Sequence, residues 1–344
     1  MNPRFPAEWE AQDGVLLAWP HEGTDWAYML DDVRPVFAEI IRRITRFERV
    51  VLTAPSAASA REYLAADGVD LDKVAVCELP NNDTWARDFG PITVIFNGQP
   101  VLLDFGFNGW GLKFAANHDN LISKRLKELG ALVPNLKTVG LVLEGGSIES
   151  DGLGTILTTA ECLLSPNRNP QLDKGEVELA LASLLGAGRV LWLNHGFLAG
   201  DDTDSHIDTL ARICPDNTIV YTACDDPRDE HYPELKLMEE ELQAFRAPDG
   251  SPYRLLPLPW PKARFDDQAH RLPATYANFL VINGAVLVPT YRDPEKDGPA
   301  LACIGQAFPG REIIGIDCRP LILQHGSLHC VTMQLPKGTL PCPA

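Results

Sequence analysis

The chain has 344 residues, of which 45% are apolar and 22% are charged, a composition that excludes disordered and fibrous proteins. Its 47 acidic residues outnumber its 30 basic residues and give a net charge of -17, which repels nucleic acid and anionic membranes and attracts small cations. No apolar run approaches the length of a membrane span, and residues 1–6 lack the basic and apolar segments of a secretory signal. We therefore expect a soluble protein with no nucleic-acid or membrane partner.

The eight cysteines are spread along the chain and are never closer than ten positions. They form no Cys-x-x-Cys pair, which excludes a zinc ribbon and a thioredoxin-type redox motif. This spacing is typical of a cytoplasmic protein with reduced thiols.

The first quarter of the chain predicts three strands separated by two helices. Between residues 33 and 47 apolar side chains recur at helical spacing, and Asp31 and Asp32 are expected to cap this helix. The second helix extends from residue 56 to Gly68, where the glycine predicts its end. The strands are short apolar runs at residues 15–19, 50–53 and 74–79.

From residue 91 onward a unit of hairpin, helix and strand repeats. The Asn97-Gly98 and Asn283-Gly284 pairs are strong hairpin signals in the first and last copies. The four copies have the hairpin, helix and strand at 91–105, 119–129 and 138–143; 155–164, 174–185 and 190–193; 206–223, 232–245 and 254–258; and 274–289, 297–308 and 312–316.

A fifth copy would combine both ends of the chain. It pairs the strand that follows Cys330 with the strand at residues 15–19, and then continues into the first helix and residues 50–52. Five similar units closed by the chain ends predict one ring, an α/β propeller of ββαβ units, rather than two domains. We therefore expect residues 1–344 to form a single domain.

Several polar residues lie where the strand of one unit leads into the next hairpin. Asp88 precedes the first hairpin, Glu144 follows the next strand, His206 and Asp208 open the third unit, and Cys330 opens the fifth. In a ring these positions converge at one end of the central axis. Each residue alone has an ordinary structural alternative: a turn cap, a solvated loop acid, a structural histidine or a buried thiol. All five residues at equivalent points of the repeat are much less expected by chance than any one of them alone.

The expected secondary structure places these side chains further. His206 and Asp208, two residues apart on what reads as a strand, would point to the same face. Cys330 is predicted to lie at the start of a buried strand, because the alternating apolar residues Val331, Met333 and Leu335 follow it.

A cysteine surrounded by several carboxylates suits a permanently cationic substrate. Amide hydrolysis needs hydrogen-bond donors for an oxyanion rather than three acids. A guanidinium group stays protonated and offers five N–H donors in a plane, so two aspartates can hold it while a thiolate attacks its central carbon. Burying like-charged acids together is costly without such a cation.

The motifs that carry these residues resemble the agmatine deiminase family, which is similar to other guanidine-modifying enzymes and to the Porphyromonas-type peptidyl-arginine deiminases. The resemblance covers almost the whole chain, and its specificity comes from five motifs in this order. They are Asn82-Asp-Thr-Trp-Ala-Arg-Asp-Phe-Gly90, Asp104-Phe-Gly-Phe-Asn-Gly-Trp-Gly111, Leu143-Glu-Gly-Gly-Ser-Ile-Glu-Ser-Asp151, Gly200-Asp-Asp-Thr-Asp-Ser-His-Ile-Asp-Thr-Leu-Ala-Arg212 and Gly326-Ser-Leu-His-Cys330.

The resemblance implies a pentein-like five-bladed α/β propeller of pseudo-fivefold symmetry. It also implies hydrolysis of agmatine to N-carbamoylputrescine and ammonia, a step of putrescine and polyamine biosynthesis. Cys330 matches the family nucleophile, Glu144 and His206 match the proton-transfer pair, and Asp88 and Asp208 match the residues that hold the guanidinium. The reaction requires no metal or organic cofactor, and the resemblance allows a homodimer.

The sequence departs from the family in two places. Many relatives have Gly-Gly-Gly-Asn-Ile-His-Cys at the nucleophile, where this chain has His325-Gly-Ser-Leu-His-Cys330, and many have a histidine where this chain has Glu149. Both changes are expected to act on the far end of the substrate. Asp202, on the approach to His206, is a candidate for binding the distal ammonium group, although it also fits a solvated turn.

Three other functions remain open at this stage. The nearest alternative is an arginine or peptidyl-arginine deiminase, or an amidinotransferase, with the same core residues. Binding the carboxylate of arginine would require a cationic side chain, and no motif obviously supplies one. A metal site would gather His206, Asp208, His325 and His329, although Gly326 and Ser327 make a helical metal pair between the last two unfavourable. A polyamine-binding module would use the aspartates without Cys330.

Overall fold

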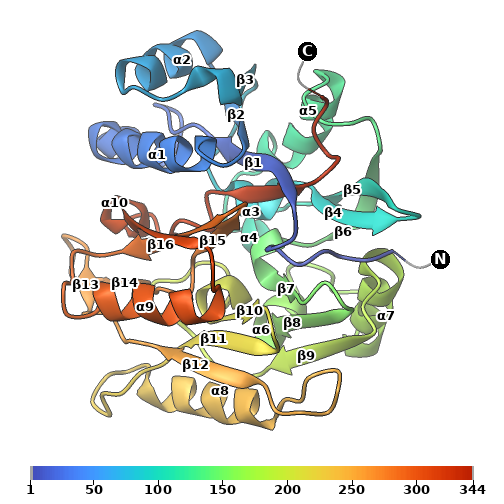
Figure 1. Cartoon of the computed structure of the whole chain (residues 1–344), viewed down its shortest axis with the longest axis vertical. Coiled ribbons are helices and arrows are strands. Elements are labelled where there is room, and N and C mark those ends of the chain that lie inside the picture. The colour runs from blue at the N-terminus through green and yellow to red at the C-terminus, as the bar shows by residue number, and fades with distance from the viewer. Residues whose placement is uncertain (1–2, 343–344) are drawn as a thin grey trace.

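Five small sheets share one strand order in the described part of the chain, residues 3–342, which the computed structural model places as an α/β fold (Figure 1). Each sheet contains an antiparallel pair of strands, and the second strand of that pair lies parallel to the next strand along the chain. An antiparallel pair needs only a tight turn, whereas a parallel pair needs a long crossover. Hairpin, helix and strand is therefore the sequence pattern that builds each sheet.

Four of these sheets are built from consecutive segments and confirm the predicted repeat. Their elements are β4 (Ile92–Phe96), β5 (Gln99–Gly106), α5 (Ile122–Glu128) and β6 (Leu136–Val142); β7 (Ile148–Ser150), β8 (Thr155–Thr159), α7 (Lys174–Leu185) and β9 (Arg189–Leu193); β10 (Ala211–Cys214), β11 (Thr218–Thr222), α8 (Tyr232–Ala244) and β12 (Arg254–Leu258); and β15 (Leu280–Ile282), β16 (Ala285–Thr290), α9 (Asp297–Ala307) and β17 (Glu312–Asp317).

The fifth of these sheets has four strands and joins the two ends of the chain. It has the order β18 (Met333–Pro336), β1 (Gln12–Ala18), β2 (Arg49–Ala54) and β3 (Val74–Glu78), with α1 (Leu30–Thr45) and α2 (Ala57–Ala66) as its crossovers. β18 runs antiparallel to β1, with Leu16 opposite Met333, and the red and blue strands lie side by side in Figure 1. The predicted pairing of the two chain ends is therefore confirmed.

Short elements connect these units. They are α3 (Ala86–Phe89), α4 (Gly109–Leu112), α6 (Ala160–Leu163), α10 (Arg319–Ile322), the two-stranded sheet of β13 (Arg264–Phe265) and β14 (Arg271–Leu272), and the 3-10 helices η1 (Ala27–Met29), η2 (Leu71–Lys73), η3 (Asp119–Leu121), η4 (Gly145–Ser147) and η5 (Ile207–Thr209). No helix within residues 3–342 combines the length and the apolar character needed to cross a membrane.

Local signals account for several element boundaries. Asn97 and Gly98 have φ of 52° and 75°, the left-handed pair that a two-residue hairpin requires. α7 begins with a capping box between Asp173 and Glu176 and ends at left-handed Gly186. The expected cap of α1 is wrong. Asp31 and Asp32 lie inside the first turn, where their negative charges interact favourably with the helix dipole but do not cap the helix.

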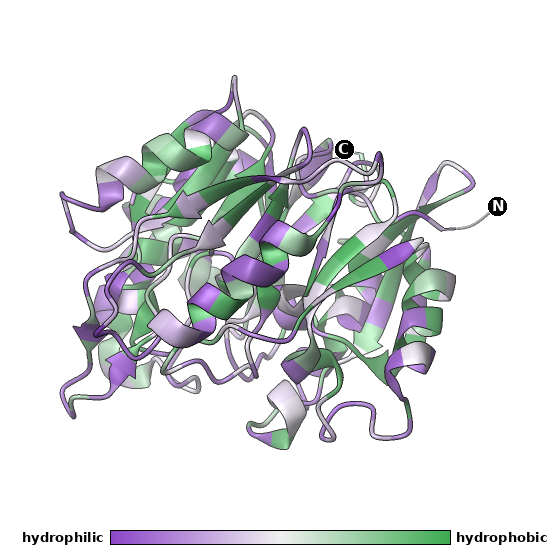
Figure 2. Ribbon diagram, turned by 90° about the horizontal axis from the view of Figure 1, so that it is seen from below, coloured by the Kyte–Doolittle hydropathy of each residue, from purple (hydrophilic) through white to green (hydrophobic). Residues whose placement is uncertain are grey.

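The core follows the apolar periodicity of the sequence. One face of α1 is buried through Val33, Phe37, Ile40, Ile41 and Ile44, and the strands carry most of the remaining core. Figure 2 shows the same division, with mostly hydrophobic strands and helices of mixed character. Burying each large apolar side chain contributes about 1.5–3 kcal/mol, so the sheets are held chiefly by these contacts.

Two expectations about local structure are wrong, and a third is confirmed. Residues 160–163 are helical instead of extended, because the Thr159 side chain caps α6, and the antiparallel partner of β8 is β7 at 148–150. Asp208 lies in the 3-10 helix η5 and not on a strand, because left-handed Asp204 and Ser205 interrupt the extended run and β10 starts only at Ala211. The prediction for Cys330 is confirmed, because this residue lies in the turn directly before β18, which begins at Met333.

Candidate active site

Site residues come from the connection that precedes the first hairpin strand of each sheet. Asp88 lies in α3 before β4, Glu144 precedes β7, Asp208 precedes β10, and Cys330 precedes β18. Asn278 occupies the equivalent place before β15. The predicted positions are thus confirmed for four units, and the fifth contributes an asparagine that the sequence analysis missed.

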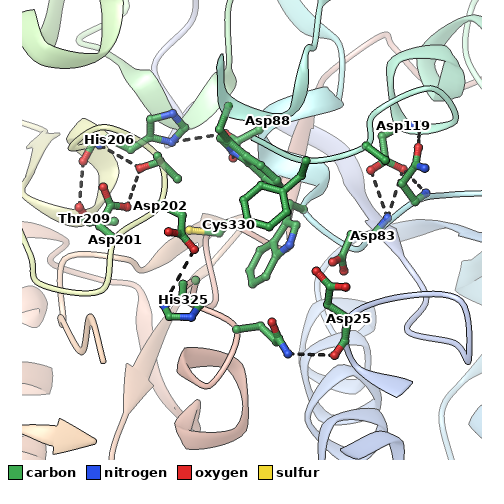
Figure 3. Close-up of a pocket in the computed structure, with 18 of the residues that line it drawn as sticks. Asp25, Asp83, Asp88, Asp119, Asp201, Asp202, His206, Thr209, His325 and Cys330 are labelled. Carbon is green, nitrogen blue, oxygen red and sulfur yellow. Dashed lines mark hydrogen bonds and ion pairs between the residues drawn. The ribbon is translucent and has the colours of Figure 1, made fainter. Parts of the chain in front are cut away.

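A cavity of about 360 Å³ lies among these connections. Asp88, His206, Asp208 and Cys330 line it, and Figure 3 shows Cys330 between His206 and the aspartates of the opposite wall. Glu144 is fully buried behind His206 and does not reach the cavity surface.

Cys330 is buried and contacts two oxygen atoms. Its Sγ lies 3.4 Å from Oδ1 of Asn278 and 3.9 Å from Oδ2 of Asp208. Burial raises the pKa of the Cys330 thiol well above its ordinary value, and the nearby charges of Asp208 and Asp88 raise it further. With these surroundings the sulfur carries its proton at neutral pH, because burial and the two negative charges both disfavour the thiolate.

Asp88 is held by two N–H groups. The indole Nε1 of Trp110 donates to its Oδ2 at 2.9 Å, and the backbone nitrogen of Gly146 donates to its Oδ1 at 2.9 Å. A Cβ atom on Gly146 would lie 2.7 Å from Nδ1 of His206 and 2.8 Å from Oδ1 of Asp88. Glycine is therefore the residue that lets these two side chains approach each other.

His206 lies between two carboxylates. Its Nδ1 is 3.6 Å from Oδ1 of Asp88, and its Nε2 is 3.8 Å from Oε2 of Glu144. Burial alone would lower the pKa of His206, but Asp88, Cys162 and Glu144 raise it well above its ordinary value. The imidazole is therefore protonated at neutral pH and can donate a proton.

Asp208 is the most buried acid of the cavity wall. Its Oδ2 lies 2.7 Å from Nδ1 of His329, whereas its Oδ1 is buried and has no hydrogen-bond partner among residues 3–342. Burial opposes ionisation, but His329 outweighs it and lowers the pKa of Asp208. The group is thus an anion with one uncommitted oxygen atom.

A buried ion-pair network fixes Asp208 from behind. Nε2 of His329 lies 2.8 Å from Oε2 of Glu8, and Nη2 of Arg212 donates to the same oxygen at 2.8 Å. Glu149, expected to act on the far end of the substrate, does not line the cavity and instead accepts a hydrogen bond from Arg212. Its contribution is to the support of the site.

Asp202 lies on the rim of the cavity, and 46% of its side chain is exposed. Its Oδ2 is 4.0 Å from Nδ1 of His325, and its carbonyl oxygen accepts a hydrogen bond from Lys113 at 2.7 Å. The structure thus brings Asp202 to the same cavity as the five core residues, but at its outer edge.

Two buried clusters have the ligand types and the spacing of a metal site. They are Glu144, Cys162 and His206, and Glu8, Glu149 and His329. In both a guanidinium group already contacts the acid, since Nε of Arg168 lies 2.8 Å from Glu144 and Nη2 of Arg212 lies 2.8 Å from Glu8. Within residues 3–342, the metal set considered from the sequence is not one of these clusters.

Two residues that contact the candidate site, Asn278 and Arg168, were not predicted from the sequence. Asn278 lies within a run without charged residues, and its only signal was that one unit of the repeat lacked a polar residue at the expected position. Arg168, which binds Glu144, lies in a loop before α7, where no periodicity or motif marks it.

The fold and the cavity define an α/β protein with a cysteine, a histidine and several acids around one buried site. A model of the Porphyromonas-type peptidyl-arginine deiminase family matches residues 4–336, and the chain belongs to this family. Agmatine deiminase of Stutzerimonas stutzeri is 33% identical to it, over 96% of this chain and 95% of that one.

Solved structures agree with this assignment. A cysteine-to-serine variant of C. jejuni agmatine deiminase with substrate bound has a TM-score of 0.91 and 40% identity, covering 98% of this chain and 97% of that one. A Porphyromonas gingivalis protein, provisionally described as an arginine deiminase, has a TM-score of 0.92 and 53% identity over 99% and 100% of the chains. Dimethylarginine dimethylaminohydrolase, at 11% identity and a TM-score of 0.51 over 94% and 100% of the chains, shares the fold.

Proposed function

We propose that this chain is an agmatine deiminase that hydrolyses agmatine to N-carbamoylputrescine and ammonia. The observation that carries the proposal is the uncommitted Oδ1 of Asp208, a buried anionic oxygen in the wall of the cavity that contains Cys330. An unpaired buried charge is costly, and a cationic ligand removes that cost. The similarity to agmatine deiminases over nearly the whole chain supports the same substrate.

Two aspartates hold the substrate in this proposal. Asp208 and Asp88 both line the cavity, and each presents a carboxylate to the planar guanidinium group. Hydrogen bonds from His329 to Asp208 and from Trp110 to Asp88 fix the orientation of both acids before substrate binds. The guanidinium carbon is then placed beside the sulfur of Cys330.

The first chemical step forms a bond between sulfur and carbon. The substrate cation favours loss of the thiol proton to solvent, and the Cys330 thiolate adds to the guanidinium carbon. His206, which is protonated, gives its proton to one of the two terminal amino groups, and the carbon–nitrogen bond breaks to release ammonia. A covalent S-alkylthiouronium remains on Cys330.

The second step returns the enzyme to its starting state. His206, now neutral, accepts a proton from water, and the resulting hydroxide adds to the thiouronium carbon. The carbon–sulfur bond then breaks, and the O-protonated ureido product gives its extra proton to the departing sulfur, which restores the Cys330 thiol. Glu144, 3.8 Å from Nε2 of His206, stabilises and orients the imidazolium that activates the water.

The charge of the cavity supports agmatine over arginine. Among the cavity-lining residues within 3–342 there is no Lys or Arg, whereas the exposed Asp25 and the half-exposed Asp202 both line the cavity (Figure 3). Both ends of agmatine are cationic, and Asp202 is the acid that we propose for the distal ammonium. The carboxylate of arginine would meet repulsion in the same space.

The architecture proposed with this function is a single domain of residues 1–344 whose five units close into a propeller of pseudo-fivefold symmetry. The pairing of β18 with β1 supports the closure, and so does Gln12, whose side chain donates to the carbonyl oxygen of Val281 at 2.9 Å. The enzyme acts in the cytoplasm in this proposal, without nucleic acid, and as a homodimer. Light scattering and one cooperative unfolding transition test the assembly and the single domain.

Ammonia release from agmatine, arginine and an arginine-containing peptide tests the function directly. We expect rapid release from agmatine, formation of N-carbamoylputrescine and no effect of a chelator. Comparable kcat/KM for arginine or for the peptide would instead assign an arginine or peptidyl-arginine deiminase. Binding of agmatine without ammonia release would indicate a polyamine-binding module.

A further inference from the structure

Arg168 connects two parts of the candidate active site that are far apart in the sequence. Its Nε lies 3.1 and 2.8 Å from the two carboxylate oxygens of Glu144. Its Nη1 donates to Oδ2 of Asp204 at 2.6 Å, and its Nη2 donates to the carbonyl oxygen of Thr203 at 2.9 Å. The side chain is 1% exposed, so all three contacts lie in a protected environment.

The turn that Arg168 binds leads directly into His206. Asp204 and Ser205 have φ of 63° and 61°, and two successive non-glycine residues in the left-handed region are unfavourable by about 1–2 kcal/mol each. Contacts from several elements offset this cost. Lys113 binds Asp204 at 2.6 Å, and Oδ2 of Asp201 accepts a hydrogen bond from the backbone nitrogen of Ser205 at 2.8 Å.

We propose that Arg168 is a positioning residue, which holds the Glu144 carboxylate and the turn before His206 in one rigid arrangement. The proposal rests on the proposed function, because it assigns Arg168 to the proton-transfer pair of that reaction. Only a guanidinium group matches this geometry, since its fork contacts a carboxylate with one nitrogen and a turn with the other two. A lysine ammonium keeps the charge but cannot make all three contacts.

Arg168 also controls the charge of Glu144. The charged or titratable side chains that face Glu144 are Arg168, His206, Cys162 at 3.9 Å, and Asp88. Burial opposes its ionisation, but His206 and Arg168 together lower the pKa of Glu144 below its ordinary value. Removing Arg168 takes away one of the two cations, so the pKa of Glu144 rises. As the pH falls, the Glu144 carboxylate is then protonated at a higher pH than in the wild type.

The test compares Arg168→Met, Arg168→Lys and a matched control, Arg189→Met. Arg189 is a part-buried arginine that donates to Oγ1 of Thr155 at 2.8 Å and to the hydroxyl of Tyr253 at 2.7 Å, away from the site. For Arg168→Met we expect kcat to fall at least tenfold, with little change in KM, and the acid limb of the kcat profile to move up by about one pH unit or more. Arg168→Lys should restore the position of the acid limb but only part of kcat.

A second readout does not depend on turnover. Carboxyl-carbon NMR of the ¹³C-glutamate-labelled full chain, with Glu144→Gln to assign the signal, follows the titration of Glu144 in the free protein. We expect its pKa to rise in Arg168→Met and to stay unchanged in Arg189→Met. Failure of the wild type to release ammonia from agmatine would contradict the proposed function alone.

The outcomes that overturn the positioning role are distinct. An unchanged Glu144 titration and an unmoved acid limb in Arg168→Met, with kcat lowered equally at every pH, would show that Arg168 only stabilises the fold. Should Arg168→Met fail to fold, Asp204→Asn provides the second variant: it removes the anchor of the turn while the contact of Arg168 with Glu144 remains. We expect it to lower kcat without moving the acid limb; an unchanged kcat would contradict the proposal.

Discussion

Nδ1 of His329 lies 2.7 Å from Oδ2 of Asp208, while Oδ1 of the same carboxylate is buried and lacks a hydrogen-bond partner in the described part of the chain. One oxygen of this acid is thus committed to the protein, and the other is the one that we propose for the substrate cation. Glu8, 2.8 Å from Nε2 of His329, holds the imidazole from its far side. The proposed binding of a cationic substrate rests on this buried negative charge.

Replacing Cys330 by alanine or serine is expected to abolish turnover and leave the fold intact. Serine is too weak a nucleophile without thiolate character, and removing one sulfur from a large core costs a few kcal/mol at most. Mass spectrometry of the enzyme during slow turnover should show an adduct on the peptide that contains Cys330. Cys224→Ala, at another buried cysteine, is the control and should retain activity. An adduct on any other cysteine would contradict the assignment of Cys330 as the nucleophile.

Asp88→Asn and Asp208→Asn are each expected to lower kcat/KM at least a hundredfold. Each change removes a charge-assisted contact with the guanidinium that is worth about 3 kcal/mol in a desolvated site. Asp104→Asn is a matched control, because Asp104 is a buried acid of β5 that accepts a hydrogen bond from Thr138 outside the cavity. Steady-state kinetics with agmatine measures the effect. Normal kinetics in Asp88→Asn would show that the guanidinium binds elsewhere.

Glu144→Gln is expected to lower kcat by about a hundredfold or more and to change KM little, because Glu144 does not reach the cavity surface and acts through His206. Glu178→Gln serves as the control, since Glu178 binds Nε1 of Trp192 at 2.7 Å outside the site. A rise in KM with unchanged kcat would place Glu144 in substrate binding and remove it from the proton-transfer pair.

Asp202→Asn is expected to raise KM for agmatine by about threefold to fivefold with kcat unchanged. The effect is small because the side chain is 46% exposed, and ion pairs in such positions contribute up to about 1 kcal/mol. It should be absent with a guanidine substrate that lacks the distal amine. Asp249→Asn, in an exposed turn, is the control. An equal effect on both substrates would exclude Asp202 as the ligand of the ammonium.

The stability of the free protein should depend on the protonation of Asp83. Burial raises the pKa of Asp83 from its ordinary 3.8 to about 7, so the folded state binds a proton that the unfolded chain releases. The stabilisation from this proton is complete below pH 3.8 and is lost as the pH rises through about 7.

Asp83→Asn removes this dependence. Its side-chain oxygen can still accept the hydrogen bonds from Trp26 and Thr84. Thermal unfolding between about pH 5 and 8 should show the variant gaining Tm relative to the wild type as the pH rises. A constant difference in Tm across this range would mean that Asp83 is ionised throughout.

Most of the secondary structure and the repeat could be predicted because they depend on local patterns. Apolar periodicity located α1, and the Asn97-Gly98 turn and the cap of α7 were readable from a few neighbouring residues. The predictions failed where a side chain or a strained turn interrupts the local pattern. At α6, the cap from Thr159 turned an expected strand into a helix.

The sequence by itself determined the types of side chain at the site, since four motifs placed Asp88, Glu144, His206, Asp208 and Cys330 at equivalent points of the repeat. Only the tertiary structure decided what surrounds them. Asn278 and Arg168 reach the site from segments with no motif of their own, and the free oxygen of Asp208 is known only once His329 is placed beside its other oxygen. Burial, charge pairing and pKa depend on distances between segments remote in the chain, and local sequence patterns do not encode those distances.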